Sequence, residues 1–146
     1  MKKIGYIVCA IVVAFFAFII AIPIVNDNVA KKTAEKVKKI QLPADTEYME
    51  TFSEAGKLVG NGNGMQYLGG ILIKSDQSLK ELQTYYSQYA QKEWECIVEK
   101  QKGREIQFVE HGAVSLNTDI DGDGYYIVYS WGDSDTIFDD LDIRGH

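Results

Sequence analysis

Cysteine and histidine are scarce in this chain, and each scarcity excludes a class of protein. The two cysteines, Cys9 and Cys96, are too few for a disulfide framework and form no C-x-x-C motif for zinc or dithiol chemistry. The two histidines, His111 and His146, belong to no nucleophile motif with a serine or a cysteine. The composition therefore predicts a protein that is not an enzyme and carries no resident cofactor.

Basic residues are scarce in the C-terminal part of the chain. Residues 42–146 contain eight Lys and Arg against 19 Asp and Glu, a net charge of −11, whereas residues 1–41 contain seven Lys against two acids, a net charge of +5. A domain with this excess of carboxylates is repelled by nucleic acid phosphates and by anionic lipid headgroups. We therefore expect no nucleic acid among its partners.

Charge is absent from one long segment near the N-terminus. Residues 4–25 are 22 consecutive uncharged residues, nearly all aliphatic or aromatic. A helix of this length spans about 33 Å, close to the hydrocarbon thickness of a bilayer. A cleaved signal peptide has an apolar core of only about 7–15 residues, and no good cleavage site follows this one. We expect a retained single-pass transmembrane helix over residues 4–25, acting as a signal anchor after a short tail at residues 1–3.

The charges that flank this segment give conflicting evidence on its orientation. Five lysines follow it and two precede it, which by the positive-inside rule places the C-terminal domain in the cytoplasm. Lys2 and Lys3, however, adjoin the apolar segment directly, whereas Asn26, Asp27 and Asn28 separate it from the lysines that follow. A signal anchor with a very short cytoplasmic tail is also the commoner arrangement. We expect a cell-membrane protein with its domain outside the cytoplasm, and a cytoplasmic domain is the alternative.

Residues 26–42 form a basic segment with a helical pattern. An apolar stripe at helical spacing runs along it: Ala30, Ala34, Val37 and Ile40. The helix should end before Pro43, because the residue preceding a proline disfavours helical dihedral angles. We interpret the segment as a helical stalk that is either a solvated spacer or a collar on anionic lipids, with about 1 kcal/mol from each lysine near the surface. The lysines expected at the membrane surface are Lys31, Lys32, Lys36, Lys38 and Lys39.

From residue 43 onward the pattern changes to strands and a single helix. Strands are expected over residues 46–53, 65–74, 93–101 and 125–131, with a further strand at residues 105–109 and 113–116 that is broken at His111 and Gly112. Ser78 and Glu81 form a capping box, so a helix should begin near Leu79. Because tight turns join neighbouring strands, the sheet should be antiparallel. The sequence predicts an α+β fold in which residues 43–146 form a small antiparallel sheet of about five strands with one helix packed on one face.

Glycines are concentrated in the segment GKLVGNGNGMQYLGG, residues 56–70. Phosphate-binding loops lead into a helix, but a strand is expected to follow this segment. Asn-Gly pairs between strands adopt positive φ angles at low cost and are typical of hairpins. We interpret Gly60, Gly62 and Gly64 as a turn. Gly69 and Gly70, inside the next strand, indicate a bulge or a close neighbour above the sheet.

One short motif has the character of a metal site. In DIDGDG, Asp119, Asp121 and Asp123 occupy positions 1, 3 and 5 of an EF-hand calcium loop, with a glycine at position 6. This resemblance to EF-hand loops covers only six residues, since position 12 is Ser130 and a strand follows in place of a helix. We expect an Asp-Gly turn and keep a calcium-binding domain outside the cytoplasm as the alternative.

Taken together, these patterns predict a membrane-anchored interaction or accessory module. Its expected partners are the lipid bilayer and an unidentified protein or envelope component. We expect the aromatic strand at residues 125–131 and the neighbouring turns to be exposed and to contact that partner.

Overall fold

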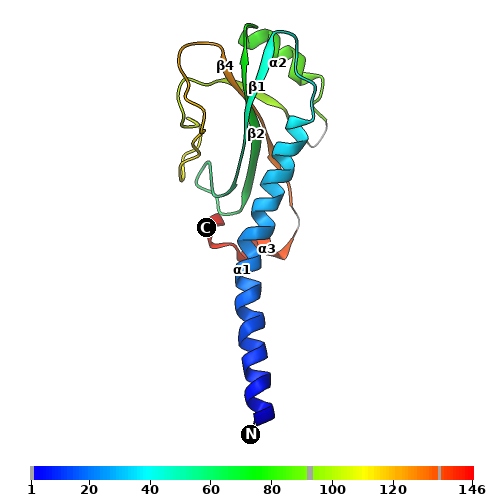
Figure 1. Ribbon diagram of the computed structural model, residues 1–146, viewed down its shortest axis with the longest axis vertical. Helices are drawn as coiled ribbons and strands as arrows, with labels where there is room; N and C mark the ends of the chain where they lie inside the picture. Colours follow the sequence, from blue (N-terminus) through cyan, green and yellow to red (C-terminus); the bar gives the residue numbers. More distant parts are fainter. Residues whose placement is uncertain (1, 92–93, 135) are drawn as a thin grey trace.

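The structure, a computed structural model, describes residues 2–91, 94–134 and 136–146. It consists of a helical rod that runs into a small α+β domain (Figure 1). The domain is built on a four-stranded antiparallel sheet with the strand order β1-β2-β4-β3. The predicted fold class is confirmed, with four strands in place of about five. Met1 of the expected tail and Glu93 at the start of the expected third strand lie outside the described residues.

The elements follow one another with short connections except between β3 and β4. They are α1 (Lys2–Lys38), β1 (Thr46–Gly56), β2 (Gln66–Ser75), α2 (Leu79–Ser87), β3 (Ile97–Lys100), β4 (Tyr125–Gly132), α3 (Ile137–Leu141) and the 3-10 turn η1 (Ile143–Gly145). The capping box that starts α2 is present, since Ser78 Oγ accepts from the Glu81 amide and Glu81 accepts from the Ser78 amide.

The long connection between β3 and β4 is where the strand prediction was wrong. Residues 105–109 and 113–116 form no strands and share a single bridge between Glu105 and Ser115. Gly112, with a φ of 83°, reverses the chain between them. The connection still places Ile106 and Val114 in the core. Its alternating apolar residues therefore reflect burial beneath a loop and not a strand.

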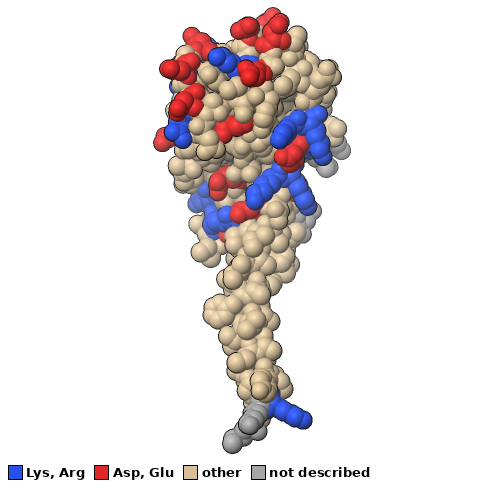
Figure 2. All heavy atoms as spheres, in the orientation of Figure 1, with Lys and Arg blue, Asp and Glu red and all other residues tan. Residues whose placement is uncertain are grey.

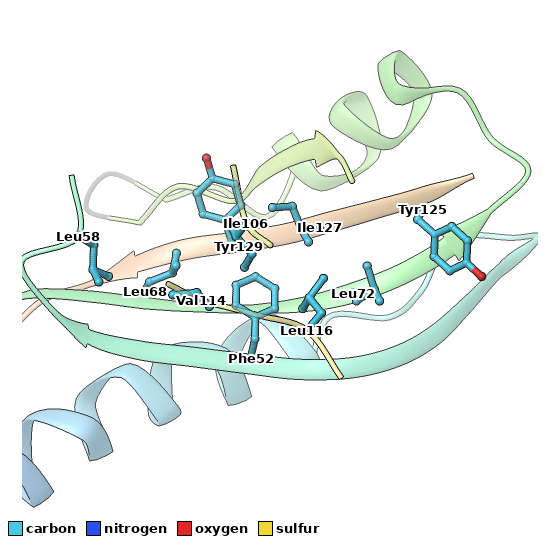
Figure 3. Close-up of a cluster of buried hydrophobic side chains, with 10 residues drawn as sticks. All are labelled: Phe52, Leu58, Leu68, Leu72, Ile106, Val114, Leu116, Tyr125, Ile127 and Tyr129. Atoms are coloured by element: carbon cyan, nitrogen blue, oxygen red, sulfur yellow. The ribbon is translucent and has the colours of Figure 1, made fainter. Parts of the chain in front are cut away.

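The sheet has two apolar faces, and β4 contributes to both by strict alternation. Tyr125, Ile127 and Tyr129 point to the face that the long connection covers, together with residues of β1 and β2 (Figure 3). Tyr126 and Val128 point to the face that α1 and α2 cover. Because β4 lies between β2 and β3 and these side chains are buried, the expected exposure of the aromatic strand was wrong.

Helix α1 approaches the backbone of β2 closely, and a glycine makes this possible. A Cβ atom on Gly69 would lie 2.6 Å from the Ala30 carbonyl oxygen and 2.9 Å from the Ala34 Cα. The close neighbour predicted for this glycine is therefore α1, and the register shift of the sheet lies in β1, between Tyr48 and Glu50. The small residues of the stalk pattern meet the sheet directly.

The glycine-rich segment between β1 and β2 is an exposed turn, as predicted. Gly60 and Gly64 have φ angles of 73° and 134°, which only glycine adopts without strain. Nothing lies within 4 Å of a Cβ atom built on Gly60, Gly62 or Gly64. These glycines are therefore required by the conformation of the turn and not by the close approach of another segment.

Substituting Gly69→Ala should destabilise the domain, because the added methyl group collides with the backbone of α1 and the helix must move off the sheet. Overpacking of this kind costs about 1–3 kcal/mol, and we expect the upper part of that range, with a fall in Tm of about 5–10 °C. Thermal unfolding of the full-length protein in detergent micelles, followed by tryptophan fluorescence, measures the effect.

Gly62→Ala is the matched control, since Gly62 lies in the exposed turn with open space around it and no positive φ. It should change the unfolding free energy by no more than about 0.5 kcal/mol. Equal Tm values for the two variants would contradict the close helix–sheet contact.

Candidate functional site

The described residues form one concentrated polar network, at the point where the rod enters the domain. We call it the junction network, made of Asn26, Asp27, Tyr67, Asp139, Asp142 and Arg144. Asn26 and Asp27 are the first polar residues after the apolar segment of α1. The other members come from β2 and from the C-terminal segment, which Figure 1 shows beside α1 at the base of the domain. The network ties the two ends of the chain together.

Asn26 is the centre of this network and is completely buried. Its side-chain nitrogen donates to the carbonyl oxygen of Phe138 at 3.0 Å and to the carboxylate of Asp142 at 2.8 Å. A buried amide requires such partners, because leaving one of its groups unpaired costs about 1–3 kcal/mol. Asn26 therefore fixes the C-terminal segment against α1.

Tyr67 joins the same network from β2. Its hydroxyl oxygen lies 2.6 Å from the carboxylate of Asp139 and 3.0 Å from the side-chain amide oxygen Oδ1 of Asn26. With one proton to give, it donates to the closer and charged acceptor. Burial and the adjacent Asp139 carboxylate raise the pKa of Tyr67 above its usual value, so the hydroxyl stays protonated and remains a donor.

Arg144 closes the network with ion pairs in two directions. Its Nε and Nη2 atoms donate to the two carboxylate oxygens of Asp142 at 3.0 and 2.8 Å, and its Nη1 donates to Asp27 at 2.8 Å. The paired, parallel contact with Asp142 is the strong form of an arginine–carboxylate interaction. The Asp142 side chain is only 3% exposed, so solvent screens this pair little.

The arginine determines the ionisation of Asp142. Hydrogen bonds from Arg144, helped by Asn26, lower the pKa of Asp142 to about 2, although burial acts in the opposite direction. The pKa of Arg144 is raised above its usual value by the same partner and by Asp27. Both groups are therefore charged at all physiological pH values, and the ion pair between them persists over this range.

Backbone hydrogen bonds fix the C-terminus from the side of the sheet as well. The Lys57 amide donates to the Arg144 carbonyl oxygen, and the Gly64 amide donates to the Gly145 carbonyl oxygen, each at 2.7 Å. These donors belong to the turn between β1 and β2. The C-terminal segment is therefore held between α1 and this turn.

The lysines expected at the membrane surface are all exposed along α1 and just beyond its end: Lys31, Lys32, Lys36, Lys38 and Lys39. At 1.5 Å per residue, the first two stand about 9–10 Å beyond Val25 and the last three about 16–21 Å beyond it. Screening in physiological salt acts over about 8 Å, so any attraction to lipid headgroups would be weaker for the last three lysines than for the first two. Lys36 and Lys38 lie over aromatic rings of the domain, Trp94 at 4.1 Å and Tyr48 at 5.2 Å. Contact of the lysines with lipid stays a prediction.

The three acids of the DIDGDG motif lie in an exposed turn before β4. The carboxylates of Asp119 and Asp123 lie near different cations, Arg104 at 3.8 Å and Lys100 at 3.5 Å, and Asp121 is exposed as well. Across residues 2–91, 94–134 and 136–146, no three Asp, Glu, His or Cys side chains converge as a metal-binding group. Calcium binding by Asp119, Asp121 and Asp123 stays a prediction.

Both histidines line one open cleft of about 430 Å³ beside the junction network. His111 is fixed there by a 2.7 Å hydrogen bond between Nε2 and the Gly60 carbonyl oxygen. Glu54 lines the same cleft, and burial together with the nearby Asp27 raises its pKa. No serine or cysteine is among the residues that line this cleft, so among the described residues it holds no histidine-activated nucleophile. We assign it no chemistry.

The sequence analysis did not identify the junction network. One signal was present, because Asn26 lies four residues before Ala30 and eight before Ala34, on the buried stripe of the helix. An asparagine on an apolar stripe predicts a buried hydrogen-bonding partner. The partners Asp142 and Arg144 lie more than a hundred residues away, and no local pattern indicates them.

The pKa of Asp142 predicts how stability depends on pH. Because its folded value of about 2 lies below the unfolded value of 3.8, its contribution is complete above about pH 5 and is lost as the pH falls toward 2. The shift corresponds to roughly 2 kcal/mol. Asp142→Asn should lower the free energy of unfolding by about this amount at pH 7 and remove this part of the acid dependence. Denaturant unfolding in micelles at pH 7 and pH 3 measures both effects.

Asp140→Asn is the control, because Asp140 belongs to the same segment and its side chain is exposed. This variant should behave as the unchanged protein at both pH values. An acid dependence that is the same in Asp142→Asn and in the unchanged protein would show that the Asp142–Arg144 pair contributes no stability.

Comparison with known proteins identifies no relative of this chain. Neither protein-family models, nor curated proteins, nor solved structures give a significant match.

Proposed function

We propose that this chain is a single-pass protein of the cell membrane whose small acidic domain stands directly on the outer surface of the bilayer. In this reading the domain is an interaction or accessory module without catalysis. The observation that carries the proposal is the continuity of α1, which leaves the apolar segment and enters the core of the domain as one helix of 37 residues.

The N-terminal half of α1 has the properties of a lipid-facing helix. Within the described residues, Lys3–Lys38 is the one helix long and apolar enough to cross a membrane. Large apolar side chains are exposed all around its first half, among them Ile7, Phe15 and Ile20. On the face shown in Figure 2, this rod carries no charged side chain between its N-terminal end and the domain. A bilayer removes this apolar surface from water.

The second half of α1 supports a rigid attachment of the domain to the membrane. Ala30, Ala34 and Val37 are buried against the sheet, so no flexible linker separates the apolar segment from the domain. Pro23 lies inside α1 and does not end it. The domain should therefore follow the tilt and rotation of its anchor.

The structure offers an explanation for the lysines that conflict with the expected orientation. Lys36 and Lys38 contact aromatic rings of the folded domain, and a cation over an aromatic face contributes about 0.5–1 kcal/mol at exposed sites. Lysines with this structural role are less informative about the side of the membrane. Their number is thus compatible with a domain outside the cytoplasm.

The end of the domain away from the rod suggests the character of the partner. Hydrogen bonds between Asp76 and Asp45 and between Ser75 and Gly124 bring three turns together at this end. Exposed acids of these turns are Asp45, Asp76, Asp121 and Asp123, and Figure 2 shows Asp and Glu side chains gathered there. A protein or envelope component with a basic surface would be attracted to this end.

Labelling of an introduced cysteine tests this proposal. Ser87→Cys places a thiol at the exposed end of α2 with little change in size. We expect a membrane-impermeant maleimide to label this variant in intact cells, with the labelled protein in the membrane fraction. Labelling only after lysis would place the domain in the cytoplasm, and labelled protein in the soluble fraction would contradict the membrane anchor.

The unchanged protein is the control, because neither native cysteine should react. Cys9 lies in the apolar half of α1, where the bilayer shields it from a charged reagent. Burial raises the pKa of the Cys96 thiol to about 12, so almost no reactive thiolate exists near neutral pH. Cys96 is partly buried, and its raised pKa should make its labelling in the native protein much slower than that of Ser87→Cys.

A further inference from the structure

The C-terminal segment presents large apolar side chains to its surroundings. Ile137 is 66% exposed, Leu141 is 47% exposed and Ile143 is 87% exposed. They belong to α3 and η1, and Figure 1 shows α3 beside α1 at the base of the domain.

The chemistry of this segment is divided between two sides. In α3, Ile137, Phe138 and Leu141 recur at the spacing of one helix face. Asp139 turns to the opposite side, where it accepts from Tyr67 at 2.6 Å. Asp142 likewise turns inward, to Arg144 and Asn26. Asp139 and Asp142 thus bind the domain, whereas Asp140 and the apolar side chains of Ile137, Leu141 and Ile143 are exposed.

Contacts with α1 determine the level of the segment relative to the bilayer. The rings of Phe18 and Phe138 lie 5.7 Å apart, and Ile22, inside the apolar segment, is buried. A hydrocarbon core of about 30 Å accommodates about 20 residues of helix, from Ile4 to Pro23. Phe18 then lies about 7–8 Å below the surface of this core, and Phe138 reaches the same depth. Interfacial helices bury their apolar faces about 5–10 Å deep.

We propose that the C-terminal segment, residues 137–143, inserts its apolar side chains into the boundary between headgroups and acyl chains beside α1, as a second membrane contact of the domain. The occupant of this surface is the bilayer, because the surface is continuous with the lipid-facing side of α1 through the Phe18–Phe138 contact. The inference rests on the proposed membrane anchor. It predicts that the domain has two points of attachment and a fixed face toward the lipid.

Fluorescence quenching in vesicles tests the depth of the segment. The full-length protein carrying Cys9→Ala is reconstituted into phosphatidylcholine vesicles, with a nitrobenzoxadiazole label on one introduced cysteine. Ile143→Cys reports on the apolar side, and Asp140→Cys, on the exposed polar side of the same segment, is the matched control. Val13→Cys reports on the middle of the apolar half of α1. Each label is quenched in turn by lipid with a spin label near the headgroup end of its chain, by lipid with a spin label deep in its chain, and by aqueous iodide.

We expect the shallow spin label to quench the label at Ile143→Cys at least twofold more than the label at Asp140→Cys, and iodide to show the reverse order. Equal and strong iodide quenching at both positions, with Val13→Cys quenched by the deep spin label, would overturn the inference and leave the membrane anchor intact. A Val13→Cys label that lipid does not quench would overturn the anchor itself. Protection of Ile143→Cys from all quenchers would assign the surface to a protein contact and overturn the inference.

Ile143→Ser provides a second measurement that needs no label. Because Ile143 is the most exposed of the three side chains, this change should leave the Tm in micelles within about 2 °C of the unchanged protein. In the unlabelled Cys9→Ala protein, the two native tryptophans, Trp94 and Trp131, follow the denaturant unfolding of the domain. In vesicles the variant should unfold at a lower denaturant concentration than its Cys9→Ala parent, whereas in lipid-free micelles of short-chain detergent the difference should shrink. An equal midpoint of variant and parent in vesicles would count against lipid contact.

Discussion

The approach of α1 to the backbone of β2 is the contact on which the rest of the structure depends. A helix can lie this close to a sheet only where the facing residues of both have small side chains, and here Gly69 faces Ala30 and Ala34. Without this contact Val37 would lose its place in the core beneath α2. The same contact fixes the axis of α1 relative to the domain, and it therefore determines where Asn26 meets the C-terminal segment. The packing of two small patches thus controls the geometry of the whole junction.

The junction network shows how polar groups are paired at the end of a long apolar helix segment. Charged and amide groups next to an apolar helix are costly unless they are paired, because water is partly excluded there. In this chain Arg144 neutralises Asp142 and Asp27 together, and Asn26 uses its amide group on the same segment. Without Arg144, the carboxylates of Asp27 and Asp142 would repel each other. Paired in this way, they leave the apolar side of the segment free.

Local patterns in the sequence predicted the parts of the structure that depend on local chemistry. The apolar segment, the capping box of α2 and the Asn-Gly turn each follow from residues within a few positions of one another. Predictions failed where the partner lies far along the chain. Residues 105–116 have the alternation of strands, but the alternating side chains fill the space beneath a loop, with Ile106 and Val114 in the core. The aromatic strand was expected at the surface, since sequence alone does not reveal that β3 pairs along its outer edge.

The distance between Asn26 and Asp142 along the chain, 116 residues, has a consequence for synthesis. Chains emerge from the ribosome N-terminus first, so α1 is synthesised long before its partners in the C-terminal segment. Until residues 138–144 are synthesised, Asn26 and Tyr67 lack their partners Asp142 and Asp139. Contacts of such high sequence separation form slowly, because the whole intervening chain must be closed into a loop first. Closure of the base of the domain therefore comes late, and a chain cut before Asp139 would lack the carboxylates that pair with Asn26 and Tyr67.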